Sequence, residues 1–379
     1  MDLSALQRCV GDVDGFLERH WNRAPLLHEY PDGFDDLASL DDFDRMIASL
    51  GLRASSLRMV RDGMSLTPTA YTVAPGKQPR ASERLVSPAL VYRRFSEGAT
   101  IVLESLHRFW EPLTDFCRDL ELALGHRLQV NAYITPPSSQ GFDIHKDTHD
   151  VFVLQVSGSK NWTVYDRDDE DEVVIRREIS PGSVLYIPTG FPHDATTGSG
   201  ASAHLTVGIL PRDATEIVGE IAKLAEEEPI FKERLEVGAA VDPSALRAVV
   251  ERNLDEMRAW LDKVDVDELT ARVARKVMST SQPILRGQLR QLAGLDSIEA
   301  STEVRRRRGA TCALLPGEAG LRVMLADREL QMPLTARDAM TYVATHERFP
   351  VSDLHPFLTL ESAVVLVKRL VREGLLEVL

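Results

Sequence analysis

The chain has 379 residues, which exceeds a typical single domain and favours two or three. With 44% hydrophobic and 27% charged residues, the composition is that of a core-forming protein, which excludes a disordered, collagen-like or disulfide-scaffold chain. The formal net charge of −14 disfavours nonspecific attraction to nucleic acid or anionic lipid and suits a basic partner.

The cysteines, Cys9, Cys117 and Cys312, are too few and too scattered for a disulfide framework or a CxxC metal site. The N-terminal segment has no basic stretch followed by an apolar one, which disfavours a secretory signal. No apolar run approaches the roughly 18 residues that a membrane span requires. We therefore expect a cytoplasmic protein that does not cross a membrane.

The first hundred residues combine short helical patterns with turns. Val13–Trp21 has apolar residues at helical spacing and ends before Pro25, and Leu26–Leu27 can open a strand. Pro112–Leu124 repeats apolar residues at i, i+3 and i+4 and stops at Gly125. These patterns predict two helices with a short strand between them.

Between Leu128 and Pro211 the pattern changes to short β-rich runs separated by turn residues. The runs are Leu128–Ile134, Val151–Val156, Trp162–Tyr165, Glu172–Ile179, Ser183–Ile187 and His204–Leu210. Many short strands at this spacing are typical of a sandwich or barrel of jelly-roll type. The acidic segment Asp166–Glu172 fits an exposed hairpin turn.

After Pro211 the strand pattern ceases and helical patterns follow. Ala214–Glu228 and Pro243–Val264 are amphipathic, and the second carries an apolar stripe. The stripe comprises Leu246, Val249, Val250, Leu254, Met257 and Leu261. Such a stripe either packs within its own chain or forms a helical contact between two copies, and the sequence favours neither.

The last segment, from about Thr270, ends in three helical patterns and the apolar terminus LLEVL. Thr335 and Asp338 fit a capping box before the first helix, Val351–Phe357 fits a short second helix, and Leu360–Glu373 fits the third. Three helices with terminal strands resemble a winged-helix module.

The basic run Arg305–Arg308 raises the question of nucleic-acid binding. Its acidic surroundings argue against DNA, and four consecutive arginines are more typical of a solvated loop or a contact to an acidic surface. Nucleic acid is therefore not the expected partner.

The segment GFDIHKDTHD contains a candidate metal site. Side chains i and i+2 of an extended chain point the same way, so His145 and Asp147 can meet at one metal ion. His193 follows the predicted strand Ser183–Ile187, which can return beside this pair in a double-stranded β-helix. Two histidines and one carboxylate form a facial triad, which suits Fe(II) and leaves positions open for O₂ and a cosubstrate.

A lone HxD pair occurs often by chance, and Lys160 adds to its specificity. A lysine buried inside a β-barrel is costly unless its ammonium meets an anion, which a carboxylate cosubstrate would supply. The alternative is three unrelated polar residues and a surface lysine.

Residues 1–212 resemble the JmjC-type cupin family of 2-oxoglutarate oxygenases, in the branch that contains ribosomal-protein hydroxylases. Besides the residues above, the resemblance rests on FLERHWNRAPLL (16–27), GATIVLESLHRFW (98–110) and NAYITPPSSQGFDIHKD (131–147). It implies a mixed α/β (α+β) chain with a jelly-roll catalytic domain at 1–212, a helical dimerisation segment at 213–269 and a winged-helix-like domain at 270–379.

The resemblance also implies roles for single residues. His145, Asp147 and His193 would hold Fe(II), and Lys160 would bind the distal carboxylate of 2-oxoglutarate. The other residues expected at the cosubstrate pocket are Asn131, Tyr133 and Thr206. A core role is expected for His204, a place behind the metal ligands for His149, and a structural hydrogen bond for Asp150.

The activity implied is oxidative decarboxylation of 2-oxoglutarate coupled to hydroxylation of a C–H bond. We expect a basic protein or peptide substrate, such as a ribosomal protein, and a homodimer. Hydroxylation of a small molecule or a natural-product peptide and a nonenzymatic metal-cupin regulator remain alternatives. Demethylation is disfavoured because few aromatic residues lie near the triad, and the HKD pattern departs from the HxH pair of metal cupins that do not use 2-oxoglutarate.

Overall fold

The computed structural model describes residues 2–74, 83–139, 142–278, 283–317 and 320–379. It divides into two compact units, Met1–Pro211 and Arg212–Leu379. Gln140 and Gly141, part of the turn expected before the HxD pair, lie outside the described residues. No helix within the described ranges is both long enough and apolar enough to span a membrane.

Two facing sheets form the centre of the first unit. The large sheet has the order β1-β11-β8-β13-β7-β6-β2-β3, and the small sheet has the order β10-β9-β12. The strands that build the sandwich are β7 Arg127–Thr135, β8 Asp150–Ser157, β9 Lys160–Tyr165, β10 Val173–Ile179, β11 Ser183–Ile187, β12 His193–Thr197 and β13 Ser202–Leu210. The jelly-roll core expected from the strand spacing is thereby confirmed.

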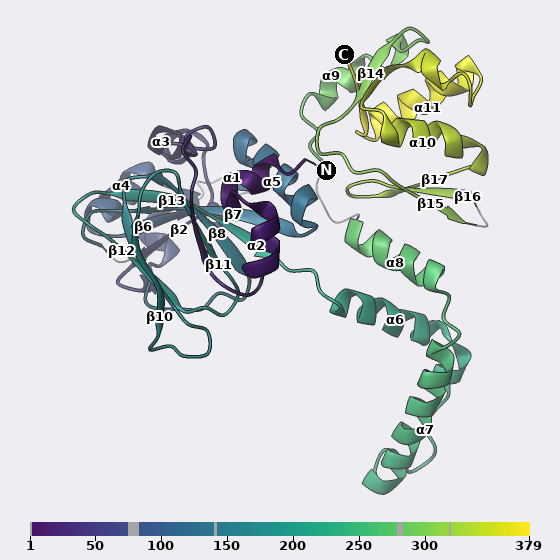
Figure 1. Ribbon diagram of the computed structural model, residues 1–379, viewed down its shortest axis with the longest axis horizontal. Helices are drawn as coiled ribbons and strands as arrows, with labels where there is room; N and C mark the ends of the chain where they lie inside the picture. The colour runs from purple at the N-terminus through teal and green to yellow at the C-terminus, as the bar shows by residue number, and fades with distance from the viewer. Residues whose placement is uncertain (1, 75–82, 140–141, 279–282, 318–319) are drawn as a thin grey trace. The chain divides into compact units, whose positions relative to one another are not determined.

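Helices cover one face of the large sheet (Figure 1). They pack against the apolar side chains of β7, β8 and β13, which alternate with residues facing the small sheet. The helices are α1 Ser4–Val10, α2 Val13–Arg19, α3 Leu40–Ser49, α4 Pro88–Ser96 and α5 Glu111–Leu124. Both predicted helices are present, and Gly125 ends α5 in the left-handed conformation at φ 72°.

Strands of the first hundred residues extend the large sheet, where the sequence suggested mainly helices and turns. They are β1 Leu26–Glu29, β2 Leu57–Arg61, β3 Met64–Ser65 and β6 Thr100–Leu103, with β4 Thr72–Val73 and β5 Leu85–Val86 in a separate pair. β6 is buried along its whole length. Its three apolar residues, 101–103, follow one another without alternation, so periodicity alone cannot distinguish this strand from a buried helical turn.

The inner face of the large sheet carries polar residues at every second position. On β13, His204 pairs with Tyr133 of β7 and with Gln155 of β8, and Thr206 pairs with Asn131 and Val153. Between Ala203 and His204 the register with β8 shifts by one residue. The result is a polar lining inside an otherwise apolar sandwich, and this lining holds the candidate site.

The described part of the second unit mixes helices with six short strands, so the expectation that strands cease after Pro211 is wrong. Its helices are α6 Thr215–Glu227, α7 Pro243–Leu261, α8 Val266–Met278, α9 Gln288–Ala293, α10 Arg337–Thr345 and α11 Leu360–Arg372. Its strands are β14 Glu303–Arg306, β15 Ala313–Gly317, β16 Gly320–Met324, β17 Glu329–Met332, β18 Arg348–Pro350 and β19 Leu376–Val378. Strands of three to five residues are too short for alternation to reveal them.

One local expectation in the second unit also needs correction. Helix α10 begins after Ala336 without a side-chain cap, and Thr335 lies in a 3-10 turn, so the predicted capping box is absent. The expected division between residues 269 and 270 falls inside α8, which continues to Met278.

Arginines of the run Arg305–Arg308 make ion pairs and hydrogen bonds within the second unit, so the run is not a solvated loop. Arg305 lies on β14 and pairs with Glu377 at 2.7 Å. Arg307 is buried and donates to the Arg286 carbonyl at 2.6 Å and to Gln288 at 2.7 Å. Arg305 therefore has an acidic partner, which agrees with the second alternative for this run, a contact to an acidic surface.

Candidate metal and cosubstrate site

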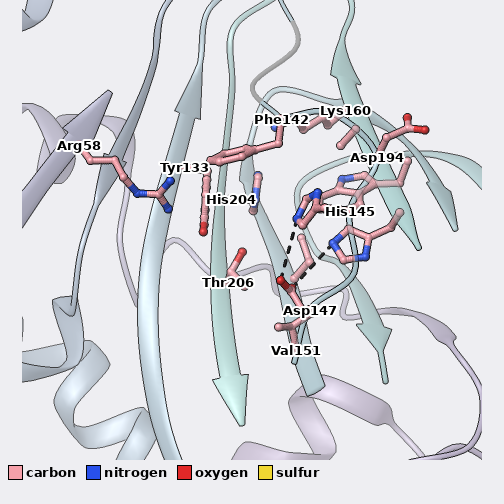
Figure 2. Close-up of a pocket in the computed structure, with 14 residues that line it drawn as sticks. Arg58, Tyr133, Phe142, His145, Asp147, Val151, Lys160, Asp194, His204 and Thr206 are labelled. Atoms are coloured by element: carbon pink, nitrogen blue, oxygen red, sulfur yellow. Dashed lines mark ion pairs between the residues drawn. The ribbon is translucent and has the colours of Figure 1, made fainter. Parts of the chain in front are cut away.

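A cavity of about 220 Å³ lies between the two sheets of the first unit. Strands of both sheets and the segment that carries the HxD pair contribute to its wall. Figure 2 shows the polar side chains of this wall gathered around one space. They include His145, Asp147, Lys160, His193, His204 and Thr206.

Three potential metal ligands meet in this cavity. Ligand atoms of His145, Asp147 and His193 all lie within 4.8 Å of one another. The Asp147 carboxylate is 3.9 Å from Nε2 of His145 and 3.8 Å from Nε2 of His193 (Figure 2). No other group of three or more such ligands meets this criterion in the described part of the chain.

Backbone hydrogen bonds fix the two imidazole-bearing segments side by side. The His145 amide donates to the His193 carbonyl at 3.2 Å, and the His193 amide donates back at 3.0 Å. The Gly190 amide donates to the Asp147 carbonyl at 3.1 Å. β12 therefore brings His193 beside the HxD pair, 46 to 48 positions earlier in the chain.

A hydrogen bond at Nδ1 orients the imidazole ring of His145, and another orients that of His193. Nδ1 of His145 lies 2.9 Å from the Asp143 carbonyl, and Nδ1 of His193 lies 3.0 Å from the Phe191 carbonyl. A carbonyl only accepts, so each Nδ1 carries the proton and each Nε2 keeps a free lone pair toward Asp147. Burial lowers the pKa of His193, which favours its neutral, metal-binding form. Two neutral imidazoles and a carboxylate fit a divalent transition metal.

Lys160 lies in the same cavity without an acidic partner. Its side chain is 4% exposed, and Nζ donates to Thr135 Oγ1 at 3.1 Å. No ion pair to Lys160 exists among the described residues. Burial lowers the pKa of this ammonium to about 8. A buried cation with one neutral hydrogen bond is a strong candidate for an anion-binding group.

Of the remaining expected pocket residues, Tyr133 and Thr206 line the cavity and Asn131 does not. The Asn131 side-chain oxygen instead accepts the Ser105 amide at 2.9 Å, so it ties two segments of the unit together. His204, expected in the core, is 3% exposed and lines the cavity as well.

Neither His149 nor Asp150 is among the residues that line the cavity. The His149 ring approaches the backbone of Gly208, where a Cβ would lie 2.6 Å from its Nε2. Asp150 accepts from the amide and the hydroxyl of Thr189, both at 2.8 Å, and from the hydroxyl of Tyr186. Asp150 therefore makes the structural hydrogen bonds expected of it.

Two residues of the site were not predicted from the sequence: Thr135, which accepts a hydrogen bond from Lys160, and Arg58, which lines the cavity. Thr135 follows the same two-residue spacing as Asn131 and Tyr133, so strand alternation could have identified it. Arg58 comes from β2, where no strand was expected. It pairs with Glu104 at 2.8 Å, and its guanidinium carbon lies 5.2 Å from the ring centroid of Phe142.

The acidic hairpin turn borders the HxD segment. The Asp166 amide donates to the Glu172 carbonyl at 2.8 Å and closes the turn between β9 and β10. Lys146, between the two candidate ligands, pairs with Glu170 at 2.7 Å. The surface beside the triad is therefore strongly acidic.

Comparisons with known proteins connect this site to a family. Residues 108–217 match the JmjC domain family. Ribosomal oxygenase 1 of Gallus gallus is 30% identical over 219 residues, covering 52% of this chain and 35% of that protein. The bifunctional lysine-specific demethylase and histidyl-hydroxylase NO66 of Drosophila grimshawi is 24% identical over 266 residues, covering 65% of this chain and 33% of that protein.

Solved structures extend the likeness of fold. The ribosomal oxygenase YcfD of Escherichia coli is 20% identical, with a TM-score of 0.58 over 97% of this chain and 98% of that one. Its complex with cobalt and 2-oxoglutarate is 19% identical, with a TM-score of 0.58 over 96% and 97%. At this identity the likeness concerns the fold alone. The chain spans about a third of the length of the curated relatives named above.

Proposed function

Because residues 108–217 belong to the JmjC domain family, as the resemblance implied, we propose that the protein is an Fe(II)- and 2-oxoglutarate-dependent oxygenase. It hydroxylates a side chain of a protein or peptide. The observation that carries this proposal is the convergence on a single cavity of two histidines, one aspartate and one buried lysine that forms no ion pair among the described residues.

In this proposal His145, Asp147 and His193 would hold a ferrous ion, and that ion would supply oxygen activation. Lys160 neutralises the distal carboxylate of 2-oxoglutarate, and Thr135 keeps the ammonium in place through their 3.1 Å hydrogen bond. The apolar walls around them exclude water from the reacting atoms.

A basic protein or peptide is the substrate that the surroundings of the site favour. The acidic turn Asp166–Glu172 borders the HxD segment through the Lys146–Glu170 pair, so a cationic segment is attracted to this side of the cavity. The names of the relatives, ribosomal oxygenase and histidyl-hydroxylase, agree with a protein substrate. A ribosomal protein would be both a protein substrate and a source of cationic segments.

The second unit supports assembly in this proposal. Residues 213–269 form a homodimer contact through the stripe on α7, where Val250 and Leu254 are 48% and 47% exposed. Residues 270–379 form a winged-helix-like domain. The contacts of Arg305 and Arg307 inside that unit agree with a module that does not bind nucleic acid. The location proposed for the protein is the cytoplasm.

The decisive experiment measures succinate formation and mass shifts of +16 Da, one oxygen atom, in proteins of a cell extract. We expect both to require enzyme, iron and 2-oxoglutarate, and to disappear in His145→Ala and Asp147→Ala with thermal unfolding still cooperative. His355→Ala, an exposed histidine of the second unit, is the matched control and retains full activity.

Turnover that persists in either ligand variant would remove the triad from the reaction. Succinate formed with small molecules but no shift in any protein would favour the small-molecule hydroxylase. Binding of 2-oxoglutarate without any turnover would favour a regulator.

A further inference from the structure

His204 lies in the cavity wall beside Lys160, and the proposed reaction gives it no role. Its ring is stacked on Tyr133 with centroids 5.1 Å apart and planes 5° apart (Figure 2). The ring of Trp162 lies in an edge-to-face arrangement with it, with centroids 5.5 Å apart. The register shift between Ala203 and His204 occurs at this residue, and such an irregularity re-aims a side chain. The ring is therefore held in a defined orientation.

One nitrogen of this ring has no hydrogen-bond partner. Nδ1 of His204 is fully buried and unpaired within the described residues. Buried N–H groups are almost always paired, whereas an unpaired acceptor is tolerated more often. The proton of the neutral ring therefore belongs on Nε2, which makes the residue a hydrogen-bond donor in the cavity wall.

The charge around the ring favours an anionic acceptor for this donor. Burial and the neighbouring charge of Lys160 both lower the pKa of His204 well below its usual range, so the ring is neutral. Within the ranges that the structure describes, Lys160 itself has the Thr135 hydroxyl as its only hydrogen-bond partner. An ammonium, a hydroxyl and an imidazole N–H in one buried region, with no carboxylate paired to the ammonium, form a binding site for an anion.

We propose that His204 is a second anchor for the distal carboxylate of the keto-diacid cosubstrate. The neutral Nε2–H donates to one carboxylate oxygen, and the Lys160 ammonium binds the other. This inference rests on the proposed oxygenase function and adds a specificity determinant to it, because two anchors on the distal carboxylate select a dicarboxylic keto acid over a monocarboxylic one.

The test measures ligand binding by calorimetry, without turnover, in protein loaded with Co(II). Two ligands are compared: 2-oxoglutarate and 2-oxobutyrate, which is the same keto acid without the distal carboxylate. His204→Phe keeps an aromatic ring against Tyr133 and removes the donor, whereas His204→Gln keeps an N–H at similar reach. A hydrogen bond to a charged group predicts roughly a 10- to 100-fold loss of 2-oxoglutarate affinity in His204→Phe.

We expect 2-oxobutyrate affinity to change less than about twofold in His204→Phe, and His204→Gln to recover most of the 2-oxoglutarate affinity. Equal losses for both ligands, or no loss for either, would overturn the proposal. If His204→Phe does not unfold cooperatively, the ratio of the two affinities in His204→Gln and in His204→Leu decides in its place. If the wild-type protein with Co(II) fails to bind 2-oxoglutarate, the proposed function itself is wrong.

Discussion

At the scale of single residues, burial of Lys160 lowers the stability of the ligand-free fold, and in the proposed function its charge binds the cosubstrate. Burial lowers its pKa from 10.5 to about 8, so the folded chain binds this proton less tightly than the unfolded chain does. Below pH 8 the residue is charged in both states, and its burial costs about 3 kcal/mol, less the contribution of its hydrogen bond to Thr135. Between pH 8 and about 10.5 this cost declines as pH rises.

Lys160→Met should therefore stabilise the ligand-free protein while it weakens 2-oxoglutarate binding. We expect the free energy of unfolding of the variant to exceed that of the wild type by about 1–3 kcal/mol at pH 7, with the difference shrinking toward pH 10. Thermal unfolding across this pH range measures it. Lys146→Met, which removes a half-exposed lysine paired with Glu170, should change stability by less than about 1 kcal/mol. A Lys160→Met protein that is less stable at pH 7 would contradict this account.

The same pKa sets a pH dependence for cosubstrate affinity. Binding of the distal carboxylate needs the protonated lysine, so the dissociation constant of 2-oxoglutarate should rise above about pH 8, approaching tenfold per pH step. Lys160→Arg keeps its charge throughout this range. We expect its affinity, measured by calorimetry with Co(II), to stay flat up to pH 9.5. A flat wild-type curve would show that Lys160 does not bind the ligand.

At the scale of secondary-structure elements, the turn from β8 to β9 depends on Gly158. Its φ is +61°, and a Cβ there would lie 2.0 Å from the Ala201 carbonyl oxygen. This turn positions Lys160 at the start of β9. The left-handed conformation and a backbone clash therefore act together against any side chain at this position.

We expect Gly158→Ala to destabilise the first unit by about 2–4 kcal/mol. Gly125→Ala is the matched control, because Gly125 has φ +72° but nothing within 4 Å of a Cβ, and it should cost about 1 kcal/mol. Chemical denaturation of the two variants gives the comparison. Equal losses would mean that the close approach to Ala201 has no energetic effect.

Elements with a strong local pattern could be predicted, and those defined by their neighbours could not. The strands at 128–210 alternate or are bounded by turns, and α5 has a full apolar face with a glycine stop. β12 was not predicted because its sequence, HDATT, lacks the apolar alternation typical of a strand. The strand nevertheless pairs with β9 along its whole length. β2 and β6 are strands because the large sheet offers edges to pair with, which local periodicity does not reveal.

At the scale of the whole molecule, the apolar stripe of α7 leads to a prediction about oligomeric state. Leu246, Val250, Leu254 and Leu261 are 38% to 48% exposed and share one side of the helix, while Val249 is buried in its own unit. An apolar face of this kind is typical of a surface covered by a partner. The proposed dimer would bury it.

Val250→Glu/Leu254→Glu should convert the proposed dimer to a monomer in sedimentation velocity, because two charges would have to be desolvated at the contact. Ala248→Glu/Ala259→Glu adds the same charges to exposed positions on the opposite side of α7 and should leave the dimer intact. A wild-type protein that sediments as a monomer would end the proposal of a homodimer.

The sequence by itself determined the class of the core and the residues that the candidate site draws on, because strand alternation, the HxD spacing and the JmjC motifs are local patterns. Tertiary structure decided which of these residues share a cavity. It brings His193 to the HxD pair, turns Asn131 to the Ser105 amide, and buries Lys160 with no acidic partner in the described part of the chain. These outcomes depend on pairing between strands far apart in the chain, and that pairing is set by the packing of the whole sandwich rather than by any local segment.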